Sequence, residues 1–293
     1  MSYRGLFVGL TTLDCIYLSD RPLEPNQKLV ARDYLTAAGG PATNAAVAFG
    51  SFNISSFDNR AKLLTVLGQH PLTNLIRSDL SDRAIELVDL IPQQLSSPPV
   101  SSIVVNATTG ERSIISINAV KSQAKRSQIP ANILDEVDLV LIDGHQIDVS
   151  LAVIDMAKKD LILVVLDGGS WKPGLEGILA GVDYAICSAN FFPPQCQSTS
   201  EVIDFLQARG IKHIAITQGE QPILYLDKGR LNTISVPNIK PVDTLGAGDI
   251  FHGAFCHYIL QEDFPTALKL AAEVASKSCQ YFGTRSWLGD RSK

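Results

Sequence analysis

One short segment, Asp243-Thr-Leu-Gly-Ala-Gly-Asp249, places a glycine-rich turn and a carboxylate directly before an apolar periodic stretch. The apolar residues that follow repeat with the spacing of one helical stripe, so the pattern predicts a helix that begins near Gly246. Main-chain N–H groups in the first turn of a helix lack internal partners and lie at the positive end of the helix dipole. The segment therefore predicts a binding place for a phosphate or another anion.

Asp249 has two interpretations in this setting. Gly246, Ala247 and Gly248 keep large side chains away, so that amides can approach the charge that develops on a transferring phosphoryl group. A carboxylate beside an anion is normally repelled, which favours a base that accepts the proton of an attacking hydroxyl. Asp is also common in first helical turns, so Asp249 as a simple helix cap is the alternative.

Two further polar positions suit a polyhydroxylated ligand. Gly39-Gly40-Pro41-Ala-Thr-Asn44 predicts a glycine turn at the start of a small-residue helix, and the Asn44 amide offers both donors and an acceptor to hydroxyl groups. Asp14 follows the first predicted strand, at the carboxyl edge of a sheet where ligands gather. A solvated strand end and a helix-surface Asn in contact with water are the alternatives.

Short apolar runs alternate with helical patterns along the chain, which predicts a mostly parallel, layered α/β sheet in one domain over residues 1–293. The predicted strands are Leu6–Leu10, Leu63–Leu67, Val137–Ile142, Leu161–Leu166, Tyr184–Cys187 and His213–Thr217. The predicted helices are Pro41–Phe49, Leu72–Val88, Val149–Lys158, Glu201–Ala208, Ile250–Leu260 and Pro265–Tyr281.

Two segments break this alternation and predict antiparallel strands outside the main sheet. They are Leu29–Thr36, and the pair Val100–Val105 with Arg112–Ile117, which a turn-rich stretch connects. An accessory sheet of this kind can close over a substrate and exclude water. An ordinary edge hairpin is the alternative.

The segment that ends at Asp249 resembles the Asp-Thr-X-Gly-Ala-Gly-Asp signature of the ribokinase, or PfkB, family of carbohydrate kinases. Gly9-X4-Asp14 and Gly39-Gly40-X3-Asn44 resemble the sugar-binding patterns of the same family, and the resemblance spans nearly the whole chain. It implies a ribokinase-like three-layer α/β/α sandwich with a mostly parallel central sheet and a small β lid from roughly 12–37 and 98–118. Within the family the chain looks most similar to ketohexokinase (fructokinase)-like members.

The resemblance also implies roles for individual residues. In the family the last Asp of the signature is the catalytic base and the Gly-Ala-Gly turn is the anion hole, which implies these roles for Asp249 and for Gly246, Ala247 and Gly248. The implied sugar-binding residues are Asp14, Gly39, Gly40 and Asn44, with Arg112 either reaching the substrate from the lid or remaining a solvated charge. The implied nucleotide-binding residues are Thr217, Gly219, Thr244, Ala275, Cys279 and Gly283.

The chain departs from the family pattern at two places. Many members carry Asn-X-X-Glu for Mg²⁺ and phosphate waters, but Phe191, Phe192 and Pro193 follow Asn190 here. We therefore assign no direct metal ligand, and expect Asn190 and Asp167 to contact Mg²⁺ only through water. The stretch after Gly68 also lacks the common Gly-X-Asp pattern, which predicts a different sugar pocket.

Composition restricts the class of protein. A net charge of −5 over 293 residues offers no broad basic surface for nucleic acid or an anionic membrane. Five widely spaced cysteines and the lack of a signal or membrane-spanning segment predict a cytoplasmic protein with reduced thiols.

These observations predict an ATP-dependent, Mg²⁺-assisted kinase that phosphorylates a primary hydroxyl of a fructose-like, ribose-like or acidic sugar. K⁺ is a further cofactor to test, and the family resemblance implies a homodimer formed through the lid. Two alternatives stay open: a nucleoside (adenosine-like) kinase and a catalytically silent sugar-binding regulator.

Overall fold

Strongly apolar strands form the centre of the protein. In the computed structural model, which describes residues 2–52 and 58–289, nine strands form a main sheet in the order β13-β12-β11-β10-β9-β8-β1-β4-β5. The first seven strands from the β5 edge are parallel, and β12 and β13 add an antiparallel edge. The strands are β1 (Arg4–Val8), β4 (Arg60–Thr65), β5 (Glu86–Asp89), β8 (Leu139–Ile142), β9 (Leu163–Gly168), β10 (Tyr184–Ser188), β11 (His213–Gln218), β12 (Gln221–Asp227) and β13 (Arg230–Ile234).

Successive residues of the central strands enter two different cores. In β1, Leu6 and Val8 belong to one buried cluster and Phe7 belongs to the other. Strand β8 divides in the same way, since all four of its residues are buried. The strands of a parallel sheet that is covered on both faces are continuous apolar runs, which is why such runs in the sequence predict these strands.

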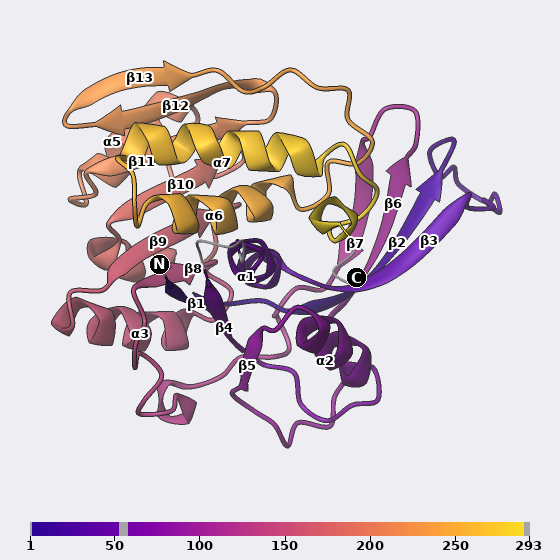
Figure 1. Cartoon of the computed structure of the whole chain (residues 1–293), viewed down its shortest axis with the longest axis horizontal. Helices are drawn as coiled ribbons and strands as arrows, with labels where there is room; N and C mark the ends of the chain where they lie inside the picture. The colour runs from indigo at the N-terminus through magenta and orange to yellow at the C-terminus, as the bar shows by residue number, and fades with distance from the viewer. Residues whose placement is uncertain (1, 53–57, 290–293) are drawn as a thin grey trace.

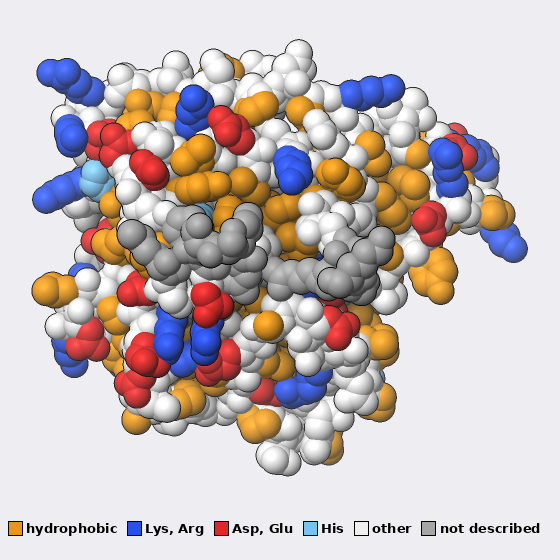
Figure 2. Space-filling view, in the orientation of Figure 1, with side chains coloured by type: hydrophobic (Ala, Val, Ile, Leu, Met, Phe, Trp, Pro, Cys, Tyr) orange, Lys and Arg blue, Asp and Glu red, His pale blue; other side chains and the backbone are white. Residues whose placement is uncertain are grey.

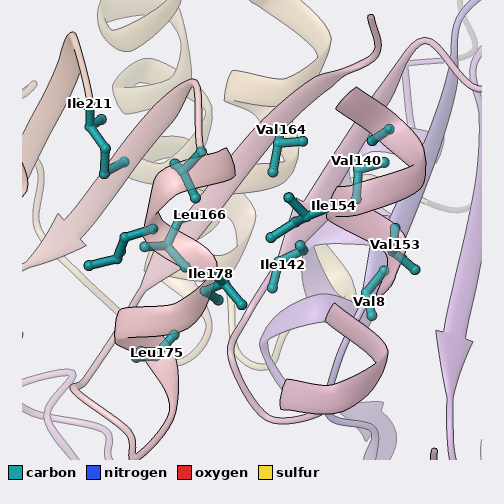
Figure 3. Close-up of a cluster of buried hydrophobic side chains, with 14 of the residues drawn as sticks. Val8, Val140, Ile142, Val153, Ile154, Val164, Leu166, Leu175, Ile178 and Ile211 are labelled. Atoms are coloured by element: carbon teal, nitrogen blue, oxygen red, sulfur yellow. The ribbon is translucent and has the colours of Figure 1, made fainter. Parts of the chain in front are cut away.

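Helices cover both faces of the main sheet, as the sequence predicts (Figure 1). Helices α1 (Pro41–Gly50), α2 (Thr73–Asp82), α6 (Ala247–Tyr258) and α7 (Phe264–Ser278) contribute to the core that contains Phe7. Helices α3 (Ile147–Lys159), α4 (Leu175–Ile178) and α5 (Thr199–Gln207) contribute to the other core. Figure 3 shows this second core, where Val153, Ile154 and Ile178 lie against the strand side chains.

A second, four-stranded sheet projects from the main body (Figure 1) in the order β3-β2-β6-β7. Its strands are β2 (Thr12–Ser19), β3 (Asp33–Gly39), β6 (Val100–Asn106) and β7 (Arg112–Ser116). Strand β2 pairs antiparallel with β3 and parallel with β6, and β6 pairs antiparallel with β7. Ile16, Ile103 and Val105 of this sheet pack with Leu245, so the sheet contacts the glycine-rich turn directly.

Three sequence-based predictions differ from the structure. The predicted helix Leu72–Val88 is too long, because α2 ends at Asp82 and the chain then enters β5, which pairs with β4. The edge strands β12 and β13 have no counterpart among the predicted elements. Asp14 lies inside β2 of the second sheet and not at the end of β1, because β2 begins only four residues after β1 ends.

The surface agrees with the composition. On the face in Figure 2, basic and acidic side chains are interspersed and form no continuous basic area. Within the described part of the chain, no helix is long and apolar enough to cross a membrane.

Gly253→Ala should lower the free energy of unfolding by about 1–3 kcal/mol, because added volume between tightly packed helices displaces one of them. A β carbon at Gly253 of α6 would lie 2.2 Å from the carbonyl oxygen of Ala45 in α1. Urea denaturation measures the change. Gly177→Ala is the control, since its β carbon meets Leu151 at an ordinary 3.5 Å. Equal stability of the two variants would show that α1 and α6 separate without cost.

Candidate active site

Two helix amino termini meet at the candidate site. Helix α1 follows Gly40, whose φ is 96°, and helix α6 follows Gly246, whose φ is 70°. Both values favour glycine. The Asn44 side chain in the first turn of α1 donates from Nδ2 to Oδ2 of Asp249 in the first turn of α6, at 2.8 Å. The structure therefore brings together two residues that are 205 positions apart in the sequence.

The glycine turn lies beside this pair. A β carbon at Gly246 would be 3.5 Å from Nδ2 of Asn44 and 3.7 Å from Oδ2 of Asp249. Apart from its chain neighbours and the backbone of α6, no described atom lies within 4 Å of the β-carbon position of Gly248, so an anion has room to approach the start of the helix there. Gly246 takes the N-cap position of α6, so Asp249, three residues further on, is not the N-cap residue.

The environment of Asp249 changes its acid–base behaviour. Burial, and to a smaller extent the nearby negative charge of Asp167, raise the pKa of its carboxyl above the ordinary 3.8. The Asn44 hydrogen bond and the charges of His252 and Arg112 lower the pKa, and the net result of all these effects is a pKa of about 7. A carboxylate with a pKa near neutrality is well matched to accept and release a proton at physiological pH.

Asp167 and His252 form a second pair of polar side chains that acts on Asp249. Asp167, the last residue but one of β9, is buried, and its Oδ2 has no hydrogen-bond partner among the described residues. That oxygen lies 3.5 Å from Nδ1 of His252. The two ring nitrogens of His252 also lie 2.7 Å from the Gly248 carbonyl oxygen and 3.1 Å from that of Ile186, so contacts on both sides fix the ring in place.

Asp14 and the double glycine form the neighbouring part of the site. Thr12 donates from Oγ1 to Oδ1 of Asp14 at 2.6 Å, and burial raises the pKa of the Asp14 carboxyl. A β carbon at Gly39 would lie 1.9 Å from Oδ2 of Asp14, and one at Gly40 would lie 2.3 Å from the carbonyl oxygen of Leu10. The two glycines are therefore needed for the backbone to approach Asp14 and Leu10 so closely.

A buried arginine connects the two parts of the site. Arg285 donates from Nη1 to Oδ1 of Asn44 at 2.9 Å, and its charge lowers the pKa of Asp14. Neither Arg285 nor His252 is among the site residues that the sequence predicts. A lone Arg after α7 carries no motif, whereas His252 could have been found because it lies three residues after Asp249, on the same helix face.

The predicted nucleotide residues fall into two groups. The amides of Val242 and Asp243 donate to the Cys279 carbonyl oxygen at 2.8 and 3.2 Å, and the Gly283 amide donates to Oδ2 of Asp243 at 2.8 Å. The end of α7, from Ala275 to Cys279, is thus held against the glycine-rich segment. Thr217 and Gly219 lie apart from this group, at the carboxyl end of β11.

Arg112 reaches the glycine-rich segment from the second sheet. It donates from Nη1 to Oγ1 of Thr244 at 2.7 Å, and Oγ1 of Thr244 donates to the Gly110 carbonyl oxygen at 3.0 Å. The turn between β6 and β7 therefore contacts the segment that leads to Asp249.

Asn190 stays outside these contacts. Its side chain is exposed, and within the described residues no hydrogen bond connects it to Asp167. The described part of the chain also contains no group of three or more His, Cys, Asp or Glu residues that could hold a metal ion.

Known proteins are similar to this chain over nearly its whole length. A family model described as pfkB family carbohydrate kinase matches residues 5–289. The curated "Deoxyribokinase" of Salmonella typhi is 26% identical over 95% of this chain and 93% of its own length. The solved structure of a putative ribokinase from Agrobacterium tumefaciens has a TM-score of 0.84 at 23% identity, covering 99% of this chain and all of the other. Arabidopsis thaliana ribokinase, solved in complex with ribose and ATP, has a TM-score of 0.75 at 19% identity, covering 99% of this chain and 100% of that chain.

The chain belongs to the pfkB family of carbohydrate kinases. It is accordingly a sugar kinase, an enzyme that transfers a phosphoryl group to an alcohol group, and it has the ribokinase fold. The similarity to ketohexokinase-like members stays a prediction.

Asp249→Asn should raise the free energy of unfolding at pH 8 by about 2 kcal/mol, a value reduced because the side chain is partly exposed. The folded-state pKa near 7 exceeds the ordinary 3.8, so ionisation of Asp249 costs stability above pH 4, fully above pH 7. The gain should disappear as the pH falls to 4, which urea denaturation across pH measures.

Asp148→Asn is the control of opposite sign. Hydrogen bonds from Arg126 lower the pKa of Asp148, so the ionised form of this residue contributes stability above its usual pKa. Its replacement should destabilise the protein at pH 8 and have less effect as the pH falls. A stability loss at pH 8 in both variants would contradict the raised pKa of Asp249.

Proposed function

We propose that this kinase transfers the γ-phosphoryl group of ATP to a primary hydroxyl of a sugar, with ribose and deoxyribose as the first acceptors to test. The contact between Asn44 and Asp249 at the start of α6 carries the proposal, because a carboxyl group with a pKa near 7 lies there in the first turn of the helix, beside the glycine turn. The names of the relatives, which include deoxyribokinase and ribokinase, support pentose acceptors.

The proposed step needs few groups. Ionised Asp249 accepts the proton of the acceptor hydroxyl, whose oxygen forms a bond to the γ-phosphorus as the bond to the bridging β–γ oxygen breaks and ADP leaves. The amides of Gly246, Ala247 and Gly248 stabilise the charge on the transferring group. The acceptor is held by Asp14 and Asn44, with Gly39 and Gly40 allowing the backbone to approach. Positioning of both reactants accounts for much of the rate.

The nucleotide is proposed to lie along the end of α7. Arg112 contacts Thr244 of the glycine-rich segment, and both residues are proposed to contact the phosphates. Ala275, Cys279 and Gly283 form the proposed adenine side, with Thr217 and Gly219 toward the triphosphate and ribose. A guanidinium group suits this place because it donates to phosphate oxygens in pairs.

Asp167 supports the proposal of Mg²⁺ as cofactor. Its buried Oδ2 without a hydrogen-bond partner suits a contact with a water molecule of a hydrated Mg²⁺, whose other ligands are phosphate oxygens. Bound Mg²⁺ neutralises the developing phosphate charge. Asn190 is a weaker proposal for a water-mediated contact, and a requirement for K⁺ is a separate proposal to test.

The second sheet is proposed to act as a lid, and its outer surface as a dimer contact. Tyr17 and Tyr34 are register partners on β2 and β3 with 41% and 68% of their surface exposed, and their rings stack at 6.3 Å. Exposed aromatic side chains of this kind are favourable contacts between subunits. We place the enzyme in the cytoplasm, where ATP is available.

An ADP-release assay with a panel of acceptors tests the proposed function. We expect turnover with ribose or deoxyribose above that with fructose, acidic sugars and nucleosides. Preference for adenosine would favour the nucleoside kinase. Ligand-induced thermal stabilisation without turnover of any acceptor would favour the silent sugar-binding regulator.

Asp249→Asn should lower kcat by about 10²- to 10⁴-fold, because it removes the proton acceptor. Dissociation constants for the sugar and for ATP, measured by calorimetry, should change little. Asp148→Asn, on the surface of α3, should keep the wild-type kcat. Wild-type turnover in Asp249→Asn would rule out Asp249 as the base.

A further inference from the structure

Arg285 is buried, and hydrogen bonds to several residues hold its guanidinium group in place. Its residue is 9% exposed, and Nε and Nη2 lie 3.2 Å from Oδ2 of Asp79 in α2. Nη2 also donates to the carbonyl oxygen of Ala38 at the end of β3, and Nη1 donates to Oγ1 of Thr284 at 3.1 Å. These contacts hold the guanidinium plane in place from two sides. Nη1 also donates to the carbonyl oxygen of Thr284 at 3.3 Å and to Oδ1 of Asn44 at 2.9 Å.

This last bond decides which way the Asn44 amide faces. The oxygen and the NH₂ group of an Asn side chain have nearly the same shape, so shape alone does not distinguish the two orientations. A guanidinium group only donates hydrogen bonds. If the amide were reversed, its NH₂ group would face the donors of Arg285 and its oxygen would face the carboxylate of Asp249. Both contacts would then be lost or repulsive.

We propose that Arg285 is a positioning residue, which holds Oδ1 of Asn44 and thereby turns the NH₂ group of that amide toward Asp249. The proposal concerns the base of the proposed function and rests on it. Without Arg285 the reversed amide becomes accessible, and it can accept a hydrogen bond only from protonated Asp249. Arg285 therefore favours the ionised form of Asp249, which is the form that accepts a proton.

A chain of contacts runs from Arg285 through Asn44 to Asp249, and different charged groups act on its two ends. Asp167 of β9, Arg112 of β7 and His252 of α6 act on Asp249. Asp79 and Arg83 of α2 and Asp14 of β2 act on Arg285. Because Arg285 binds Ala38, the contact chain also connects the root of the second sheet to the base. The orientation of the Asn44 amide that faces the proposed base thus depends on the position of Ala38 at the end of β3.

Titration of Asp249 by NMR, in the full chain labelled with ¹³C at the Asp carboxyl carbons, tests the proposal. The signal that Asp249→Asn removes belongs to Asp249. Arg285→Gln should raise the pKa of Asp249 by about one unit, because a Gln side chain can donate or accept and no longer selects one amide orientation. Arg285→Lys should stay near wild type, since an ammonium group only donates. Arg77→Gln is the control, because Arg77 of α2 pairs with Asp89 of β5 and, among the described residues, makes no hydrogen bond to Asn44, Asp249 or Arg285.

A double-mutant cycle separates an effect through Asn44 from a direct effect of charge. In the Asn44→Ala background, Arg285→Gln should leave the pKa of Asp249 unchanged. Two results would overturn the proposal: an equal pKa shift with and without Asn44, or no pKa shift in the protein that retains Asn44. If Arg285→Gln fails to fold, Asp79→Asn replaces it in the cycle, since it removes the charged anchor of Arg285 and should shift the pKa in the same direction.

Activity distinguishes this proposal from the proposed function. If Asp249 is the base, the acid limb of the kcat/KM profile should move upward by the same amount as the pKa in Arg285→Gln. If the NMR shift occurs while the wild type phosphorylates no acceptor, the proposed function fails and the role of Arg285 stands. If the wild type is active and the acid limb of Arg285→Gln equals that of Arg77→Gln, the role of Arg285 fails and the function stands.

Discussion

The hydrogen bond between Asn44 and Asp249 is the interaction on which the rest of the site depends. It joins the first turn of α1 to the first turn of α6, and both helices begin at a glycine with positive φ. Each helix therefore directs the positive end of its dipole toward this contact. The proposed function brings a phosphate and a hydroxyl acceptor together at this contact between two glycine turns.

The close packing of α1 and α6 maintains this arrangement. Ala45 and Gly253 approach so closely that even a methyl group has no room between the two helices. Small residues at this contact bring the helix starts near enough for a hydrogen bond between their side chains. Burial at the same place raises the pKa of Asp249, so one packing feature determines both the position and the acidity of the proposed base.

The second sheet is connected to this centre at two points. Arg112 contacts Thr244 at the outer end of the glycine-rich segment, and Ala38 binds Arg285 at the root of β3. A sheet that contacts the glycine-rich segment directly, and the Asn44 amide through Arg285, is well placed to transmit its own position to the site. These contacts support the proposal that the sheet acts as a lid, because closure would change the hydrogen bonds of Arg112 to Thr244 and of Arg285 to Ala38.

The sequence by itself determined the class of fold and the residues of the two glycine turns. Apolar strand runs and helical stripes follow from burial on one or two faces, and positive-φ turns require glycine, so both leave local signals. Only the tertiary structure decided that α2 gives way to β5, that Asp14 belongs to the second sheet, and that Arg285 and His252 join the site. These outcomes depend on contacts between residues far apart in the chain, such as Asn44 and Arg285, and no local spacing encodes them.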